Sequence, residues 1–281
     1  MPLSDDWLAQ RRRIPHLTTT ALPIGTGCDA GQISAVAQYL DAAIDRSSAA
    51  RRLTATITDE DETQLDALWT LLSDLMVELP NELDKVVELM QAIEALPPGL
   101  QTDWPQLHRF HEVWYERYRT HLDSHLAWEN DDLEDDRVSG LRAYHHAIGR
   151  AESEIYLCGL MPAFRGYEVI SMVCQGRKGI DVLLSEVYGW MSGSTSLRYD
   201  VDDPLESRSY RYAGLAIREA TMEDHWDNWT AQVLAFSQDD SVMEDGRALS
   251  DEGRKLAGRI HVHLRDGLWD GYGGISSATG V

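Results

Sequence analysis

The sequence predicts an all-α protein, an irregular multi-helix bundle of about nine to ten helices around a central cavity. Three observations support this prediction. Apolar residues recur every three or four positions through most of the chain. Ser, Thr, Asp or Asn precede several of these segments as capping residues. No stretch alternates polar and apolar residues between hairpin turns, as exposed strands do.

The N-terminal half is expected to begin with an arm over residues 1–27, followed by a helix over residues 31–46. Thr58 precedes four acidic residues, which favour the positive end of a helix dipole, and this second helix continues to Pro80. Asn81 can cap a third helix that ends at Pro97. Because almost nothing separates the second and third helices, we expect an antiparallel hairpin.

Residues 104–128 carry the most distinctive pattern, and Asp103 can cap the helix that they predict. At 100° per residue, three histidines and several aromatic side chains fall on one half of this helix. Such a face suits the wall of a ligand pocket as well as a packing surface. The histidines are His111, His121 and His125, and the aromatic residues assigned to substrate binding are Trp114 and Tyr118.

In the C-terminal half, Ser139 is expected to cap a long helix that ends at Pro162. Because the helical patterns are alike on both sides of a polar loop at 192–209, we predict a single helical domain over 28–265. A flexible glycine-rich tail is expected over 266–281. The remaining helices are predicted over residues 167–175, 180–191, 210–220, 222–237 and 250–265, and Ser250 is expected to cap the last of them.

The composition limits the classes of partner. The chain carries 47 acidic and 25 basic residues, a net charge of −22, which should repel nucleic acid and anionic membranes. Its three cysteines are isolated, which suggests reduced thiols. No signal peptide and no apolar run long enough to cross a membrane is visible. We therefore expect a cytoplasmic protein without nucleic-acid or membrane partners.

His145 and Glu152 are the best candidates for acid–base chemistry. They are seven residues apart, two turns on one helix face, and flank an apolar stripe that contains Tyr144. A carboxylate that is partly desolvated there suits proton transfer near neutral pH. The alternative is a structural ion pair between Glu152 and an arginine. The neighbouring His146 and Arg150 are expected to face solvent.

The full candidate site combines two helices of this half with the 104–128 helix. Trp226 and Trp229 begin a helix whose stripe favours core packing, although they can also line a ligand site. The predicted catalytic residues are Glu152, His125, His145 and His121. The predicted substrate-binding residues are His111, Trp114, Tyr118, Tyr144, Trp226 and Trp229.

Two patterns raise the question of a metal. His121 and His125 have the spacing of metal ligands on a helix, but Leu122 stands where a metalloprotease has glutamate. Asp131, Asp132 and Asp135 have the Asp-Asp-x-x-Asp spacing with which class I terpene synthases bind magnesium. The second magnesium motif of those enzymes is incomplete here. We therefore predict no metal and no cofactor, and keep a magnesium-dependent cyclase as an alternative.

The N-terminal half resembles a large fungal family of helical proteins of unknown function. The matching features are a Leu68-Trp69 helix that ends at Pro80, a second helix that ends at Leu96-Pro97, and Trp104 opening the next helix. The resemblance implies a helical fold and a fungal setting, where such proteins often accompany secondary-metabolite pathways. It implies no catalytic residues.

Two classes of function remain open. The first is a cofactor-independent enzyme of secondary metabolism, a cyclase, isomerase or dehydratase that acts on an apolar small molecule. The second is a non-catalytic scaffold that binds a small molecule or a protein. Convergence of the histidines and Glu152 on one cavity would favour the enzyme, and separate burial would favour the scaffold. A homodimer is left open.

Overall fold

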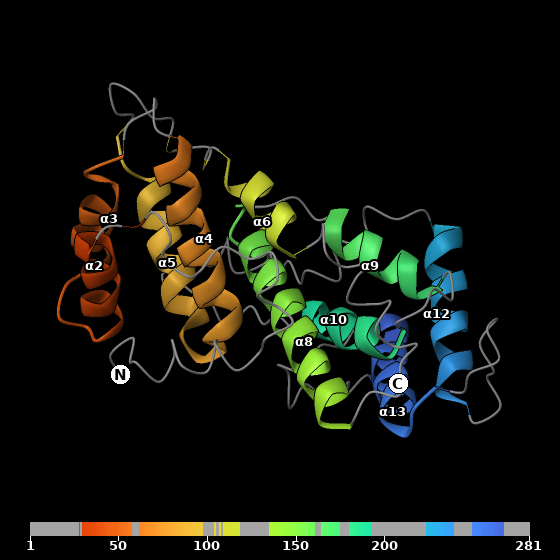
Figure 1. Cartoon of the computed structure of the whole chain (residues 1–281). Helices are drawn as coiled ribbons and strands as arrows, with labels where there is room; N and C mark the ends of the chain where they lie inside the picture. The colour runs from red at the N-terminus through yellow and green to blue at the C-terminus, as the bar shows by residue number, and fades with distance from the viewer. Residues whose placement is uncertain are drawn as a thin grey trace, which may run out of the picture. The chain divides into compact units, whose positions relative to one another are not determined.

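The computed structural model describes residues 28, 30–57, 62–97, 104, 107, 109–118, 135–160, 164–174, 180–192, 223–238 and 249–266. Over these ranges the chain forms ten α-helices, one 3-10 turn and no strand, which confirms the predicted all-α class (Figure 1). The central cavity stays a prediction. The arm at 1–27, the helix at 210–220 and the tail beyond Asp266 lie outside the described residues.

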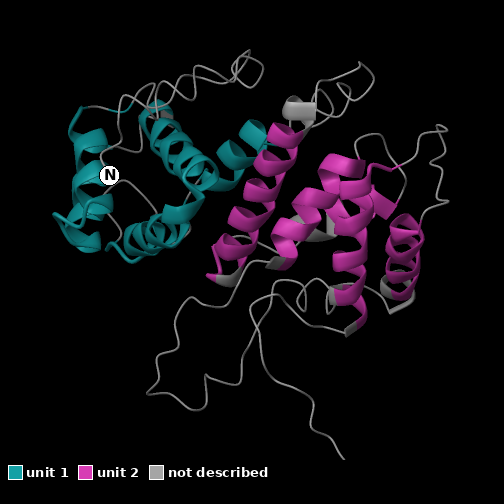
Figure 2. Cartoon of the chain, turned by 90° about the horizontal axis from the view of Figure 1, so that it is seen from below, with its two compact units in different colours: residues 1–123 teal, residues 124–281 magenta. Residues whose placement is uncertain are grey.

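The chain divides into two compact units, residues 1–123 and residues 124–281 (Figure 2). Each unit has its own buried side chains, with Trp69 and Trp114 among the largest in the first and Trp190 in the second. Cooperative folding of 28–265 as a single domain stays a prediction. No helix in the described ranges is long and apolar enough to cross a membrane.

Five helices of the first unit surround its apolar core. The predicted helix at 31–46 is wrong in its second half, because the chain leaves the helix after Leu40 and Ala42 takes a φ of 58°. A new helix then begins after Asp45, whose carboxylate accepts a hydrogen bond from the Ser48 amide. The helices are α2 (Ala30–Leu40), α3 (Arg46–Thr54), α4 (Glu62–Glu78), α5 (Leu83–Glu94) and α6 (Phe110–Tyr118).

Helices α4 and α5 pack side by side, as the expected hairpin requires (Figure 1). The 3-10 turn Pro80–Glu82 joins them. Asn81 therefore lies inside the turn and does not cap α5, which corrects its predicted role. The residue before α5 is Glu82, and its side chain makes no capping hydrogen bond.

The helix predicted over 104–128 is shorter at its start. Leu107 and Arg109 have φ values of 42° and 64°, which no right-handed helix accommodates, so α6 begins at Phe110. The Arg109 guanidinium donates two hydrogen bonds to Asp66 on α4, at 2.8 and 2.9 Å, and so anchors this turn. Residues 119–128 lie outside the described part of the chain.

The second unit is built around α8, which begins at Asp135, so Ser139 lies within the helix and is not its cap. The helix ends before Gly159, whose φ of 77° is a left-handed conformation that glycine accepts readily. Ser250 caps the last helix as predicted, since its Oγ accepts a hydrogen bond from the Gly253 amide at 3.0 Å. The helices are α8 (Asp135–Leu157), α9 (Phe164–Cys174), α10 (Ile180–Ser192), α12 (Glu223–Ser237) and α13 (Asp251–Asp266).

Candidate functional site

The residues predicted from the sequence fall on both compact units. His111, Trp114 and Tyr118 belong to the first unit, on α6. The second unit contains Tyr144, His145 and Glu152 on α8, and Trp229 on α12. Predicted residues outside the described part are His121, His125 and the side chain of Trp226.

In the first unit, the aromatic face of α6 is a packing surface. The Phe110 ring lies 5.7 Å from that of Trp69 and 6.0 Å from that of Trp114, and Trp114 lies 4.6 Å from Tyr118. Trp114 and Tyr118 are buried, while His111 is half-buried. This column of rings fills the core against α4. Core packing therefore accounts for the aromatic stripe of α6 without a ligand pocket.

One carboxylate beside this column escaped the sequence interpretation. Asp74 on α4 is 1% exposed. It accepts a hydrogen bond from the Tyr118 hydroxyl at 3.1 Å and forms an ion pair with Arg117. Because a buried charge is costly unless it is paired, these partners explain how Asp74 lies in an apolar core.

In the second unit, α8 and α10 cross at two glycines. A Cβ atom added to Gly149 would lie 2.1 Å from the backbone oxygen of Glu186. One added to Gly189 would lie 2.2 Å from the backbone oxygen of His146. Both distances are far below van der Waals contact. The two backbones therefore meet directly, and side chains on either side of the crossing are brought within hydrogen-bond distance.

A buried polar cluster lies beside this crossing. His145 Nδ1 is 2.7 Å from Glu186 Oε2, and Trp190 Nε1 donates a hydrogen bond to Glu152 Oε2 at 2.8 Å. His145, Glu152 and Glu186 are 0% exposed, and Trp190 is 1% exposed. We call His145, Glu152, Glu186 and Trp190 the α8/α10 polar cluster.

Along the crossing, residue numbers increase in the same direction on α8 and on α10. Arg142 is 3.6 Å from Asp181, His145 contacts Glu186, and Glu152 contacts Trp190. Helices that pair in this order run in broadly the same direction, so the chain needs a crossover between them. The segment that contains α9 supplies it.

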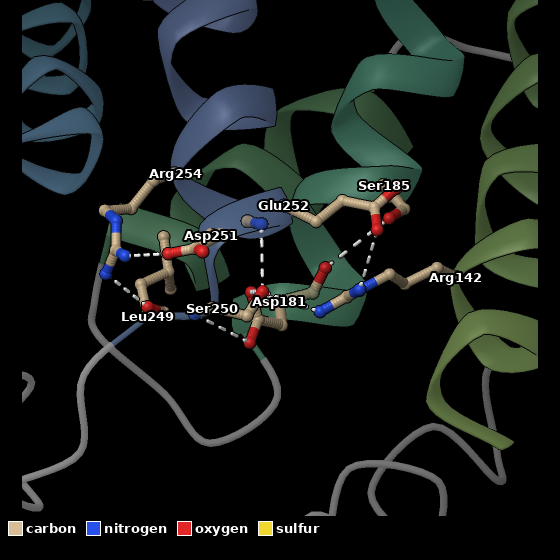
Figure 3. A network of polar contacts seen from close by, with 9 residues as sticks. Arg142, Asp181, Ser185, Leu249, Ser250, Asp251, Glu252 and Arg254 are labelled. Atoms are coloured by element: carbon tan, nitrogen blue, oxygen red, sulfur yellow. Dashed lines mark hydrogen bonds and ion pairs between the residues drawn. The ribbon is translucent and has the colours of Figure 1, made fainter. Parts of the chain in front are cut away.

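A second network holds the beginnings of α10 and α13 against α8 (Figure 3). The Ser250 hydroxyl donates to Asp181 Oδ1 at 2.8 Å and accepts from Arg142 Nη2 at 2.7 Å. Glu252 adds an ion pair to Arg142 at 3.3 Å. Because Asp181 lies in the first turn of α10, this network fixes the helix that carries Glu186 and thereby positions the α8/α10 polar cluster.

The chemistry of the cluster follows from its donors and acceptors. A carboxylate that accepts from Nδ1–H of an imidazole orients the ring and leaves Nε2 as the atom that can exchange a proton. The cluster thus contains two buried carboxylates, those of Glu152 and Glu186, beside one imidazole. Such a concentration of buried titratable groups is typical of functional sites, although structural networks also contain them.

The other residues near the cluster are more peripheral. The half-buried Tyr144 ring stands edge-on to the His145 ring at 5.8 Å. Trp229 is 6% exposed, consistent with core packing. Burial raises the pKa of Cys174 to about 12, so this thiol is not a nucleophile near neutral pH.

The expectation that His146 and Arg150 face solvent is wrong. Both are half-buried, and the His146 ring lies 5.6 Å from that of Tyr188. The side of α8 that seemed polar in the sequence packs against other helices of the unit.

The partner of His145 was missed by the sequence interpretation, although the sequence contains a signal for it. Glu186 is the one charged residue between Val182 and Met191, in an otherwise apolar segment. A lone carboxylate in an apolar helix must be buried or paired. Which helix would supply its partner depends on the packing of α8 against α10.

No family model, no curated protein and no solved structure matches this chain. The resemblance to a fungal helical family therefore stays a prediction. Within the described residues, no group of three His, Cys, Asp or Glu side chains is arranged to hold a metal ion. The acidic motif of the magnesium alternative lies outside that part, since Asp131 and Asp132 are not described and Asp135 is described only in its backbone.

Proposed function

We propose that this protein is a cofactor-independent enzyme that acts by acid–base chemistry on an apolar small molecule. His145 is the group that transfers the proton, and Glu186 orients it. The single observation that supports this proposal is the 2.7 Å contact between these two side chains, which are 0% exposed. Glu152, the base expected from the sequence, becomes a second carboxylate beside the pair.

The energetic argument is the cost of burying these groups. Replacing a buried ionic or polar pair by apolar residues of similar volume is often neutral or stabilising, so stability alone gives little reason for such a pair. Buried apolar neighbours, Ile148 and Ile155 on α8 and Val187 on α10, favour an apolar substrate. Proton transfer without a redox partner corresponds to a cyclase, an isomerase or a dehydratase.

The cellular setting belongs to the same proposal. A cytoplasmic location rests on the isolated cysteines, and a fungal secondary-metabolite setting rests on the resemblance of residues 68–104 alone. A second copy of the chain is kept as a partner.

A second candidate is the non-catalytic binding scaffold. It is favoured by the fact that His145 and Glu152 each have a partner on α10, as a purely structural network requires.

The enzyme proposal is tested by proton exchange. The protein is incubated in D₂O with a library of apolar alkenes, ketones and alcohols, and mass spectrometry records deuterium uptake or a changed product. We expect the wild type to act on at least one compound, and Glu186→Gln and His145→Gln to lower that rate by about a hundredfold or more. Glu116→Gln, which removes an exposed carboxylate on α6, is the matched control and should keep full activity.

The result that contradicts the enzyme is equally concrete. Compounds that raise the melting temperature of the wild type but are never exchanged or converted would favour the scaffold. Full activity in a folded Glu186→Gln variant would remove the α8/α10 polar cluster from the chemistry. Near-ultraviolet circular dichroism of each variant separates loss of activity from loss of the fold.

A further inference from the structure

A second group of polar side chains lies at the α8/α10 crossing, and three helices contribute to it. The His146 ring is 5.6 Å from the Tyr188 ring, and the Arg259 guanidinium carbon lies 4.3 Å from the centre of the same Tyr188 ring. Arg259 also donates a hydrogen bond to the Tyr188 hydroxyl. We call His146, Arg150, Tyr188 and Arg259 the arginine cluster.

The side chains that α8 contributes to the arginine cluster and to the α8/α10 polar cluster project in different directions. At 100° per residue, His146 and Arg150 project about 130° away from His145 and Glu152. Whereas the polar cluster is enclosed, Arg259 is exposed and Arg150 is half-buried. The arginine cluster is therefore partly exposed, through the side chain of Arg259.

The charge around His146 is unusual for this chain. Burial lowers the pKa of His146, and so do the positive charges of Arg150 and Arg259. On α13, the sequence from residue 253 to residue 265 contains no Asp or Glu.

Arg150 provides an independent geometric observation. Its Nε is buried and has no hydrogen-bond partner within the described residues. Leaving a buried donor without a partner is unfavourable, and more so when the group is charged. An anion seated beside Arg150 would remove this cost and would also screen the two arginines from each other.

We propose that the arginine cluster is a binding site for a small oxyanion, a phosphate or carboxylate group of a ligand. Arg150 and Arg259 supply the charge and the planar donors that match such oxygens in pairs. His146 and Tyr188 line the site between them. The proposal does not depend on acid–base catalysis at His145.

The test is a titration of the whole protein with inorganic phosphate and, separately, with acetate, at constant ionic strength set with chloride. We expect saturable binding by calorimetry and a rise in melting temperature. Arg150→Gln should weaken that binding by about tenfold or more. Arg52→Gln is the matched control, because it removes the same charge from exposed Arg52 on α3 and should leave the affinity unchanged.

Proton NMR of the wild type is a second measurement that does not depend on the Arg150→Gln variant. The His146 imidazole resonance, assigned with His146→Gln, should shift with phosphate or acetate along the same binding curve as the calorimetric signal. Response to phosphate alone indicates a phosphate group, and response to both indicates a carboxylate as well. Absence of any shift with either anion, or equal affinity in Arg150→Gln and the wild type, would overturn the proposal.

Discussion

Gly149 and Gly189 are the residues whose surroundings leave the least room for change. We predict that Gly149→Ala destabilises the protein by at least about 3 kcal/mol, because its Cβ atom would meet the backbone of Glu186 and force α8 away from α10. The 2.1 Å approach is to a carbonyl oxygen, which no side-chain rotation can relieve. Urea unfolding followed by circular dichroism measures the difference.

The same helix offers the control. Gly140 is exposed, and a Cβ atom there would have nothing within 4 Å. Because alanine favours the helix over glycine by about 1 kcal/mol, Gly140→Ala should be neutral or stabilising. Equal effects at Gly140 and Gly149 would mean that the crossing is looser than the structure shows.

Side-chain roles could be predicted where periodicity alone decides them. His145 and Glu152 were expected on one partly buried face of α8, and both are buried there. Glu186 and Trp190 were missed as their partners, because a single sequence does not say which helices pack together. His146 was misjudged for the same reason, since helices pack around more than one side of α8.

The N-terminus of α13 is held by several side-chain hydrogen bonds. Ser250 caps it and also connects Asp181 with Arg142 (Figure 3). We predict that Ser250→Ala lowers the free energy of unfolding by about 1–2 kcal/mol, because the cap and two further hydrogen bonds are lost together. Thermal unfolding at several urea concentrations gives this value.

Ser237→Ala serves as the comparison, since the Ser237 hydroxyl bonds only locally to the Leu234 carbonyl near the end of α12. Its effect should stay within about 0.5 kcal/mol of zero. If Ser250→Ala were equally silent, the network in Figure 3 would contribute nothing to stability.

Capping residues predicted some helix boundaries correctly and others wrongly. Ser250 was identified correctly, but Ser139 was not, because Asp135 and Asp136 just before it are also polar and the helix begins there. The break before α6 could not be foreseen. Left-handed backbone at Leu107 and Arg109 is rare for residues other than glycine, and neither residue type indicates it.

For the molecule as a whole, the two compact units raise the question of independent folding. The largest buried side chains of the first unit, including Trp69 and Phe110, contact one another within that unit. We predict that a fragment of residues 28–123 is helical and melts cooperatively. Circular dichroism and calorimetry of this fragment test the prediction, with the full chain as reference.

An unfolded fragment would instead support the single domain over 28–265 that the sequence predicts. In that case the full chain should show one calorimetric transition whose van't Hoff and calorimetric enthalpies agree. Two resolved transitions in the full chain would support independent units.

The direct backbone contact at Gly149 and Gly189 also determines how precisely α8 and α10 are placed relative to each other. Where side chains space two helices, a repacked rotamer or an exchanged methyl group moves one helix relative to the other. Here the two backbones are in direct van der Waals contact, and no side chain between them can repack to change the spacing. The positions of His145 and Glu186 relative to each other are therefore held by backbone packing. Substitutions of apolar neighbours such as Ile148 or Val187 should change the free energy of unfolding. They should leave the distance between His145 and Glu186 nearly unchanged.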